Sequence, residues 1–111
     1  MATYTYKVLA QSAPTNTSLT DIYTVGASTS AAATALTICN QTGTAATFRV
    51  SVAVAGAADV AKQYLFYDAS CPANSTITVE VGLTLATTDV LRVKTNTANA
   101  LSFNLFGTEI T

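Results

Sequence analysis

The most constraining feature of this chain is a regular alternation of apolar and polar side chains with a period of two residues. Over residues 48–54 every second residue is Phe or Val, and the intervening residues include Arg49 and Ser51. The alternation recurs over residues 76–81 and 101–105. In an extended chain successive side chains point to opposite faces, so this pattern is typical of strands with one buried face. Antiparallel sheets with one face in water contain such strands.

Further strand signals fill much of the remaining sequence. Short runs rich in β-branched or aromatic residues occur at residues 4–9, 21–25, 34–39, 63–67 and 90–94. Gly, Pro and Asn fall at or between the ends of these runs, as turns require. We therefore predict an all-β fold: a single antiparallel β-sandwich of about eight short strands, either jelly-roll or Ig-like.

Two Ala-rich segments, 31–35 and 57–62, favour helix by intrinsic propensity. Both are shorter than an independently stable helix and are followed by strand-like sequence, so we expect at most a helical turn after Gly56. No repeat or linker divides the 111 residues, and we expect one domain over residues 1–111. Residues 1–20 are a candidate extended N-terminal arm, because residues 11–18 are polar and loop-like.

Charge is scarce in this sequence. Charged residues make up 10% of the chain, far below the roughly 25% typical of soluble domains. Either Ser, Thr, Asn and Gln keep the surface hydrated, or other protein chains cover much of it, and the mean hydropathy of +0.38 favours the second explanation. The five basic residues form no run that could follow a phosphate backbone, so nucleic acid is not an expected partner. No apolar stretch approaches the ~18 residues of a membrane span, and the N-terminal residues do not resemble a signal peptide. We expect synthesis in a cytoplasm.

The residue types that carry most enzyme chemistry are missing or dispersed. The sequence has no histidine, the commonest general base and metal ligand, and no glycine-rich phosphate loop. Its two cysteines, Cys39 and Cys71, lack zinc-site spacing, and we expect both to be free thiols. The acidic residues are scattered, which leaves a carboxylate-pair glycosidase as a minor alternative. We predict a protein that is not an enzyme and that uses no catalytic residue, metal or cofactor.

The aromatic residues are the remaining candidates for a functional site. Five tyrosines could pack in the core, anchor an interface or stack on sugars, and we favour packing because the chain has no tryptophan. Phe103 and Phe106 are three residues apart and should point to opposite faces of a strand. We expect Phe106 to pack on a neighbouring element or subunit. The candidate interface residues are Tyr4, Tyr6 and Phe106.

Three segments carry a family resemblance: ATYTYKVL at residues 2–9, ATFRV at 46–50 and LSFNLFGTEI at 101–110. Together with residues 72–77 and 82–86, they resemble small virion structural proteins of tailed bacteriophages, including cyanophages. The similarity covers most of the chain and rests on core and turn residues.

The resemblance implies a capsid decoration, or cement, protein. Such a protein binds between subunits of the major capsid protein on the surface of the phage head, often as a homotrimer. The alternative from the same resemblance is a structural module of the tail or fibre, or a host-adhesion module. A sugar-binding adhesin of this kind would need exposed aromatic residues beside polar loops.

Overall fold

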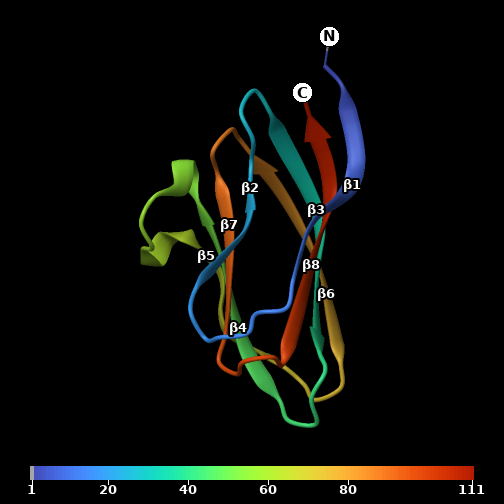
Figure 1. Ribbon diagram of the computed structural model, residues 1–111, viewed down its shortest axis with the longest axis vertical. Helices are drawn as coiled ribbons and strands as arrows, with labels where there is room; N and C mark the ends of the chain where they lie inside the picture. Colours follow the sequence, from blue (N-terminus) through green and yellow to red (C-terminus); the bar gives the residue numbers. More distant parts are fainter. Residues whose placement is uncertain (1) are drawn as a thin grey trace.

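The computed structural model describes residues 2–111 (Figure 1). Eight strands account for most of this chain, and two short 3₁₀ helices interrupt the connection between the fourth and fifth strands. The strands are β1 (Tyr4–Ser12), β2 (Thr20–Thr24), β3 (Ser30–Asn40), β4 (Ala46–Ala53), β5 (Tyr64–Cys71), β6 (Thr76–Leu85), β7 (Val90–Thr95) and β8 (Leu101–Ile110). The 3₁₀ helices are η1 (Val54–Gly56) and η2 (Ala61–Gln63). The predicted all-β fold is confirmed.

The strands form two antiparallel sheets of four strands each. Sheet A has the order β1-β8-β3-β6, and sheet B has the order β2-β7-β4-β5. Figure 1 shows the two sheets as two layers, with the segment that contains η1 and η2 projecting from the outer side of sheet B. This strand order, with two four-stranded sheets, is that of a jelly roll. The sequence pattern had left the jelly-roll and Ig-like arrangements open.

The core lies between the inner faces of the two sheets and follows the period of two. Phe48 and Val50 of β4 are buried, as are Phe103 and Leu105 of β8. The rings of Phe48 and Phe103 meet across the core in an edge-to-face arrangement, with their centroids 6.4 Å apart. Burying each such side chain contributes about 1.5–3 kcal/mol relative to exposing it, so the alternating segments account for most of the packing between the sheets.

The Ala-rich segment at residues 31–35 is part of strand β3 and not a helix. Ala31 and Ala33 are buried opposite Glu109 and Gly107 of β8. A Cβ atom on Gly107 would overlap the carbonyl oxygen of Ala32 and would lie 2.8 Å from Cα of Ala33. The two backbones therefore approach too closely for larger residues, and this tertiary constraint overrides the helix propensity of alanine.

Most of residues 1–20 belongs to the sandwich. Strand β1 pairs with β8 from Tyr4 opposite Ile110 to Ser12 opposite Phe103. Thr3 and Thr111 extend this pairing with two backbone hydrogen bonds of 2.7 and 2.9 Å. Only residues 13–19 form a loop between β1 and β2. The structure thus differs from the expected extended arm, because β8 already supplies backbone partners for this segment.

A small polar cluster joins the two sheets at one end of the core. The hydroxyl of the buried Tyr23 on β2 donates a 2.6 Å hydrogen bond to Oε2 of Glu109 on β8, and Lys7 Nζ lies 3.0 Å from Oε1. The bond from Tyr23 and then the charge and bond of Lys7 lower the pKa of Glu109 below its usual value. Burial, followed by the same carboxylate, raises the pKa of Tyr23. Both pKa shifts favour the forms that make this hydrogen bond at neutral pH, an ionised Glu109 and a protonated Tyr23.

We expect the Tyr23→Phe variant to lose about 1.5–3 kcal/mol of unfolding free energy at pH 7, the value of a hydrogen bond to a charged group. The folded state lowers the pKa of Glu109, so its contribution is present above the pKa of the unfolded chain and is lost as the pH falls. Urea unfolding should therefore show a smaller difference at pH 3 than at pH 7. An equal loss at both pH values would contradict this role, and Tyr6→Phe on an exposed ring is the control.

Candidate interaction surface

The outer faces of the two sheets differ in charge. On sheet B, Arg49 pairs with Asp68 at 2.7 Å and Arg92 pairs with Asp21 at 2.8 Å. Lys94 lies opposite Arg49 on the same face. On the outer face of sheet A, by contrast, Glu80 is the one charged residue among those that the structure describes, because Lys7 and Glu109 point to the inner side. The scarce charge of the chain is thus concentrated on one layer.

We call the outer face of sheet A the neutral face. Strand alternation and pairing place apolar, Thr and amide side chains there from all four strands. Its members are Tyr4, Tyr6, Val8, Gln11, Ser30, Ala32, Ala35, Thr37, Cys39, Thr76, Thr78, Glu80, Thr84, Ser102, Asn104, Phe106, Thr108 and Ile110. A face of this composition loses little hydration free energy when another protein covers it, because it buries few charges.

The most exposed apolar residues of the neutral face lie on the edge strand β1. Tyr6 is 83% exposed, Tyr4 is 60% exposed and Val8 is 45% exposed. In the register of the sheet, Val8 lies opposite Phe106 and Tyr4 lies opposite Ile110, both of which are half-buried. Side chains opposite one another on neighbouring strands are in contact range. These residues therefore form one continuous apolar strip along β1 and β8.

The three residues selected from the sequence come together on this strip. Phe103 is buried in the core, whereas Phe106 lies on the opposite face, as their spacing indicated. On the neighbouring strand β1, Tyr6 lies opposite Thr108 and diagonal to Phe106, whereas Tyr4 lies opposite Ile110, four residues further along β8. Sequence reasoning missed Val8, although it shares the parity of Tyr4 and Tyr6. It was missed because only aromatic residues were considered as interface anchors; the bulge after Val8, which places Leu9 in the core, leaves the parity of residues 4–8 unchanged.

Strand β1 also forms one edge of sheet A. Strand β8 pairs with one side of the β1 backbone. The other side of this nine-residue strand has no strand partner within the described chain. Edge strands of this length can accept a further strand from another chain. The exposed tyrosines and the free edge therefore occur on the same element.

Among the residues that the structure describes, the side chains form no arrangement typical of a metal centre. In residues 2–111, no group of three or more His, Cys, Asp or Glu side chains is close enough to share a metal ion. Cys39 and Cys71 are free thiols, and burial raises the pKa of Cys71. No helix within the described residues is long and apolar enough to cross a membrane.

Comparison with known proteins gives a structural similarity and no sequence family. No family model and no curated protein sequence matches the chain. A chain in the structure of infectious bursal disease virus, Gx strain, superposes with a TM-score of 0.55 and 10% identity, covering 99% of this chain and 32% of that one. For the Gt strain the TM-score is 0.50 and the identity 8%, with 98% and 31% covered.

This chain therefore spans about a third of the length of the two viral chains. At these identities the similarity concerns the fold, and it agrees with the β-sandwich described above.

Proposed function

We propose that this chain is a non-enzymatic structural protein of a virion, and specifically a capsid decoration protein that binds between major capsid protein subunits of a phage head. The observation that carries the proposal is the neutral face, which combines exposed aromatic residues with almost no charge. Two further observations support it. The jelly roll is a fold common among capsid proteins, and the similar solved chains come from a virus. The sequence resemblance supports the assignment to phages.

The dimensions of the neutral face suit a protein interface. The molecule measures 48 × 27 × 20 Å, and the two layers lie side by side in the view down the shortest axis (Figure 1). The outer face of sheet A is therefore bounded by the 48 Å and 20 Å dimensions. A standard interface buries about 800 Å² on each partner, so this face can carry one full contact. A homotrimer would present three such faces to neighbouring capsid subunits.

The mechanism in this proposal is binding without chemistry. A protein that binds the assembled shell, and not its separate subunits, stabilises the shell by RT ln(1 + [L]/Kd) at each site. Repetition over the many equivalent sites of a capsid multiplies this free energy. A tail- or fibre-associated module would use the same face on a different partner, and it remains the alternative.

The proposal predicts that Tyr6→Arg prevents binding to the particle. Tyr6 is the most exposed aromatic residue of the neutral face, so arginine there should leave the fold intact and place an unpaired charge in the interface. The assay uses virus particles made without this protein, to which purified protein is added, and it measures bound copies per particle. We expect at least a tenfold loss of affinity for Tyr6→Arg.

Tyr67→Arg is the matched control, because Tyr67 is 60% exposed on sheet B, away from the neutral face. It should bind particles as the wild type does. If Tyr6→Arg binds normally, or if Tyr67→Arg is the variant that loses binding, the neutral face is not the docking surface. A monomer in solution at micromolar concentration would contradict the trimer but not the docking surface.

A further inference from the structure

The outer side of sheet B carries a second surface feature, which the proposed function does not use. A shallow cavity of about 610 Å³ lies between strands β4 and β5 and the segment that connects them. We call it the tyrosine groove, and its lining residues are Arg49, Asp59, Val60, Ala61, Tyr64 and Tyr67. Its volume falls within the range of sites that bind small molecules, and its lining combines apolar surface with a few polar groups.

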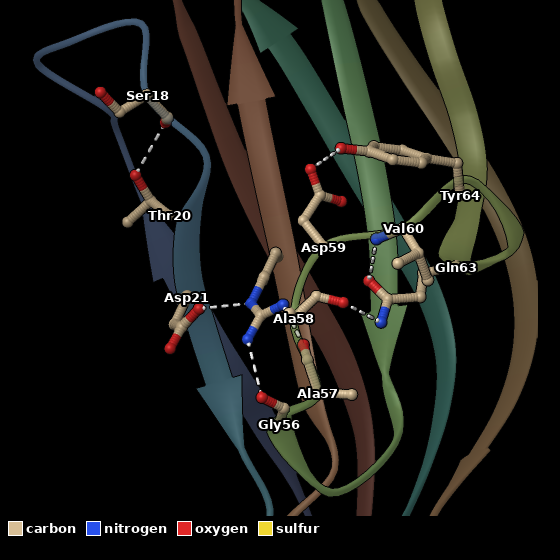
Figure 2. Close-up of polar contacts among 11 residues, drawn as sticks. Ser18, Thr20, Asp21, Gly56, Ala57, Ala58, Asp59, Val60, Gln63 and Tyr64 are labelled. Carbon is tan, nitrogen blue, oxygen red and sulfur yellow. Dashed lines mark hydrogen bonds and ion pairs between the residues drawn. The ribbon is translucent and has the colours of Figure 1, made fainter.

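Specific hydrogen bonds hold the connecting segment in place over sheet B (Figure 2). Arg92 of β7 donates to the carbonyl oxygens of Ala57 and Gly56 at 2.8 and 3.3 Å. The buried Gln63 donates to the carbonyl oxygen of Ala58 at 2.9 Å and accepts a bond from the backbone N–H of Val60. These hydrogen bonds hold the backbone in place on both sides of Asp59. The wall of the groove is therefore formed before any ligand binds.

Two tyrosine rings and an arginine form the floor and opposite wall. The rings of Tyr64 and Tyr67 are perpendicular, with their centroids 5.1 Å apart. The guanidinium carbon of Arg49 lies 3.8 Å from the centroid of the Tyr67 ring. Despite these contacts, 60% of Tyr67 is exposed. Exposed aromatic surface of this kind can serve as a binding platform where polar groups converge beside it.

The polar groups beside the rings are oriented and electrically balanced. The Tyr64 hydroxyl donates a 2.9 Å hydrogen bond to Oδ2 of Asp59, as Figure 2 shows, which leaves Oδ1 free to accept another. Arg49 donates to both oxygens of Asp68 at 2.7 and 3.1 Å, and its guanidinium also interacts with the Tyr64 hydroxyl. The bond from Arg49 lowers the pKa of Asp68, so this pair stays ionised and neutral overall.

We propose that the tyrosine groove binds a neutral saccharide. The C–H hydrogens on one face of a pyranose carry slight positive charge and suit the negative face of a tyrosine ring. A carboxylate oxygen and a guanidinium N–H side by side match the donor and acceptor of neighbouring sugar hydroxyls. The inference goes beyond the proposed function and does not depend on it, since the groove lies on the opposite sheet from the neutral face.

The charge balance separates a neutral sugar from anionic ligands. A sialic acid or a phosphate needs an unpaired cation in the groove. Asp68 already neutralises Arg49, Lys94 lies opposite Arg49 but does not line the groove, and the lining includes a second carboxylate in Asp59. Burying an anion against that carboxylate would be unfavourable. Apolar peptides are also less suited to the groove. They would remove water from the Tyr64–Asp59 and Arg49–Asp68 pairs without offering these polar groups new hydrogen-bond partners. Both classes remain as outcomes of the test.

The test measures binding of the intact protein to a glycan array of neutral and acidic oligosaccharides. Two-dimensional NMR titrations with galactose, glucose, mannose, N-acetylglucosamine, sialic acid and inorganic phosphate then map the site. We expect binding of at least one neutral sugar, with shifts confined to residues 49 and 59–68. The Tyr67→Ala and Asp59→Asn variants should each weaken this binding at least tenfold. Tyr6→Ala, which removes an exposed tyrosine from the other face, should bind sugar normally.

Several results would overturn the proposal. They are the absence of any sugar binding, binding of sialic acid or phosphate alone, and neutral-sugar binding that Tyr67→Ala leaves unchanged. Tyr67 and Asp59 are exposed, so both variants should fold. If either fails to fold, Tyr64→Phe keeps the ring and removes only the hydroxyl that orients Asp59, and it should weaken binding severalfold. Because particle binding is measured separately with Tyr6→Arg, failure of the saccharide proposal leaves the decoration proposal intact.

Discussion

The Gly107→Ala variant is expected to be destabilised by about 3 kcal/mol or more, the upper part of the range for inserting a group into packed structure. Gly107 lies on the central strand β8 opposite Ala33 of β3. A Cβ atom there would meet the backbone of Ala32 and Ala33, not a side chain that could rotate away. Relief requires separation of β8 from β3, which breaks pairing in the middle of sheet A.

A loss of this size is a large part of the stability of a domain of 111 residues, which is commonly 5–15 kcal/mol. The measurement is the free energy of unfolding in urea, compared with the Gly43→Ala variant. Gly43 is in the turn between β3 and β4, and a Cβ atom there would have no neighbour within 4 Å. We expect Gly43→Ala to change stability little. Similar stabilities for both variants would contradict the close approach of β8 and β3.

The Asn40→Leu variant is expected to lose about 3 kcal/mol of unfolding free energy. Asn40 is 2% exposed at the end of β3 and makes four hydrogen bonds through its side chain. Its Nδ2 donates to the carbonyl oxygens of Thr44 and Cys71 at 2.9 and 3.1 Å. Its Oδ1 accepts from the backbone N–H and the hydroxyl of Thr42. It thereby closes the turn after β3 and ties sheet A to β5 of sheet B.

Leucine has a similar size but would leave these backbone groups without partners, at about 1–3 kcal/mol for each one that water cannot reach. Asn96→Ala is the control, because Asn96 also accepts a backbone hydrogen bond, from Thr47, but is exposed. The Asn96→Ala variant should lose less than about 1 kcal/mol of unfolding free energy, since water replaces the side chain as the hydrogen-bond partner. Thermal and urea unfolding of the two variants compare them directly. Equal losses would mean that burial of Asn40 contributes nothing.

The fold class was predictable because it depends on local patterns. The alternation over residues 48–54 and 101–105 identifies strands β4 and β8 and their buried faces, and both agree with the structure. The choice between jelly roll and Ig-like sandwich was not predictable in this way. It depends on which distant strands pair, such as β1 with β8, and no local pattern of side chains specifies that.

The candidate surfaces were predictable to different degrees. The positions of three residues of the neutral face were predictable from the alternation of side chains. Tyr4 and Tyr6 share one face of a strand, and Phe106 points away from the core face that contains Phe103. Pairing of β1 with β8, which brings them together, was visible only in the structure. For the tyrosine groove, the sequence raised sugar stacking as an option for the tyrosines and favoured packing instead.

The groove depends on tertiary contacts that the sequence does not reveal. The bulges of β5 place Tyr64 and Tyr67 on the outer side of sheet B, and Arg92 from β7 anchors the segment that carries Asp59. These contacts join residues about 35 positions apart in sequence. The two surfaces lie on opposite sheets, so one molecule can use the neutral face for attachment while the tyrosine groove stays open to solvent.

The position and copy number of the protein in purified virus particles test the proposed function most directly. Cryo-electron microscopy of the particle, with quantitative mass spectrometry of its proteins, gives both. We predict many copies spread regularly over the shell, each with β1 and β8 of sheet A against the major capsid protein. A few copies at one vertex would instead indicate a tail component, and absence of the chain from purified particles would contradict a structural role in the virion.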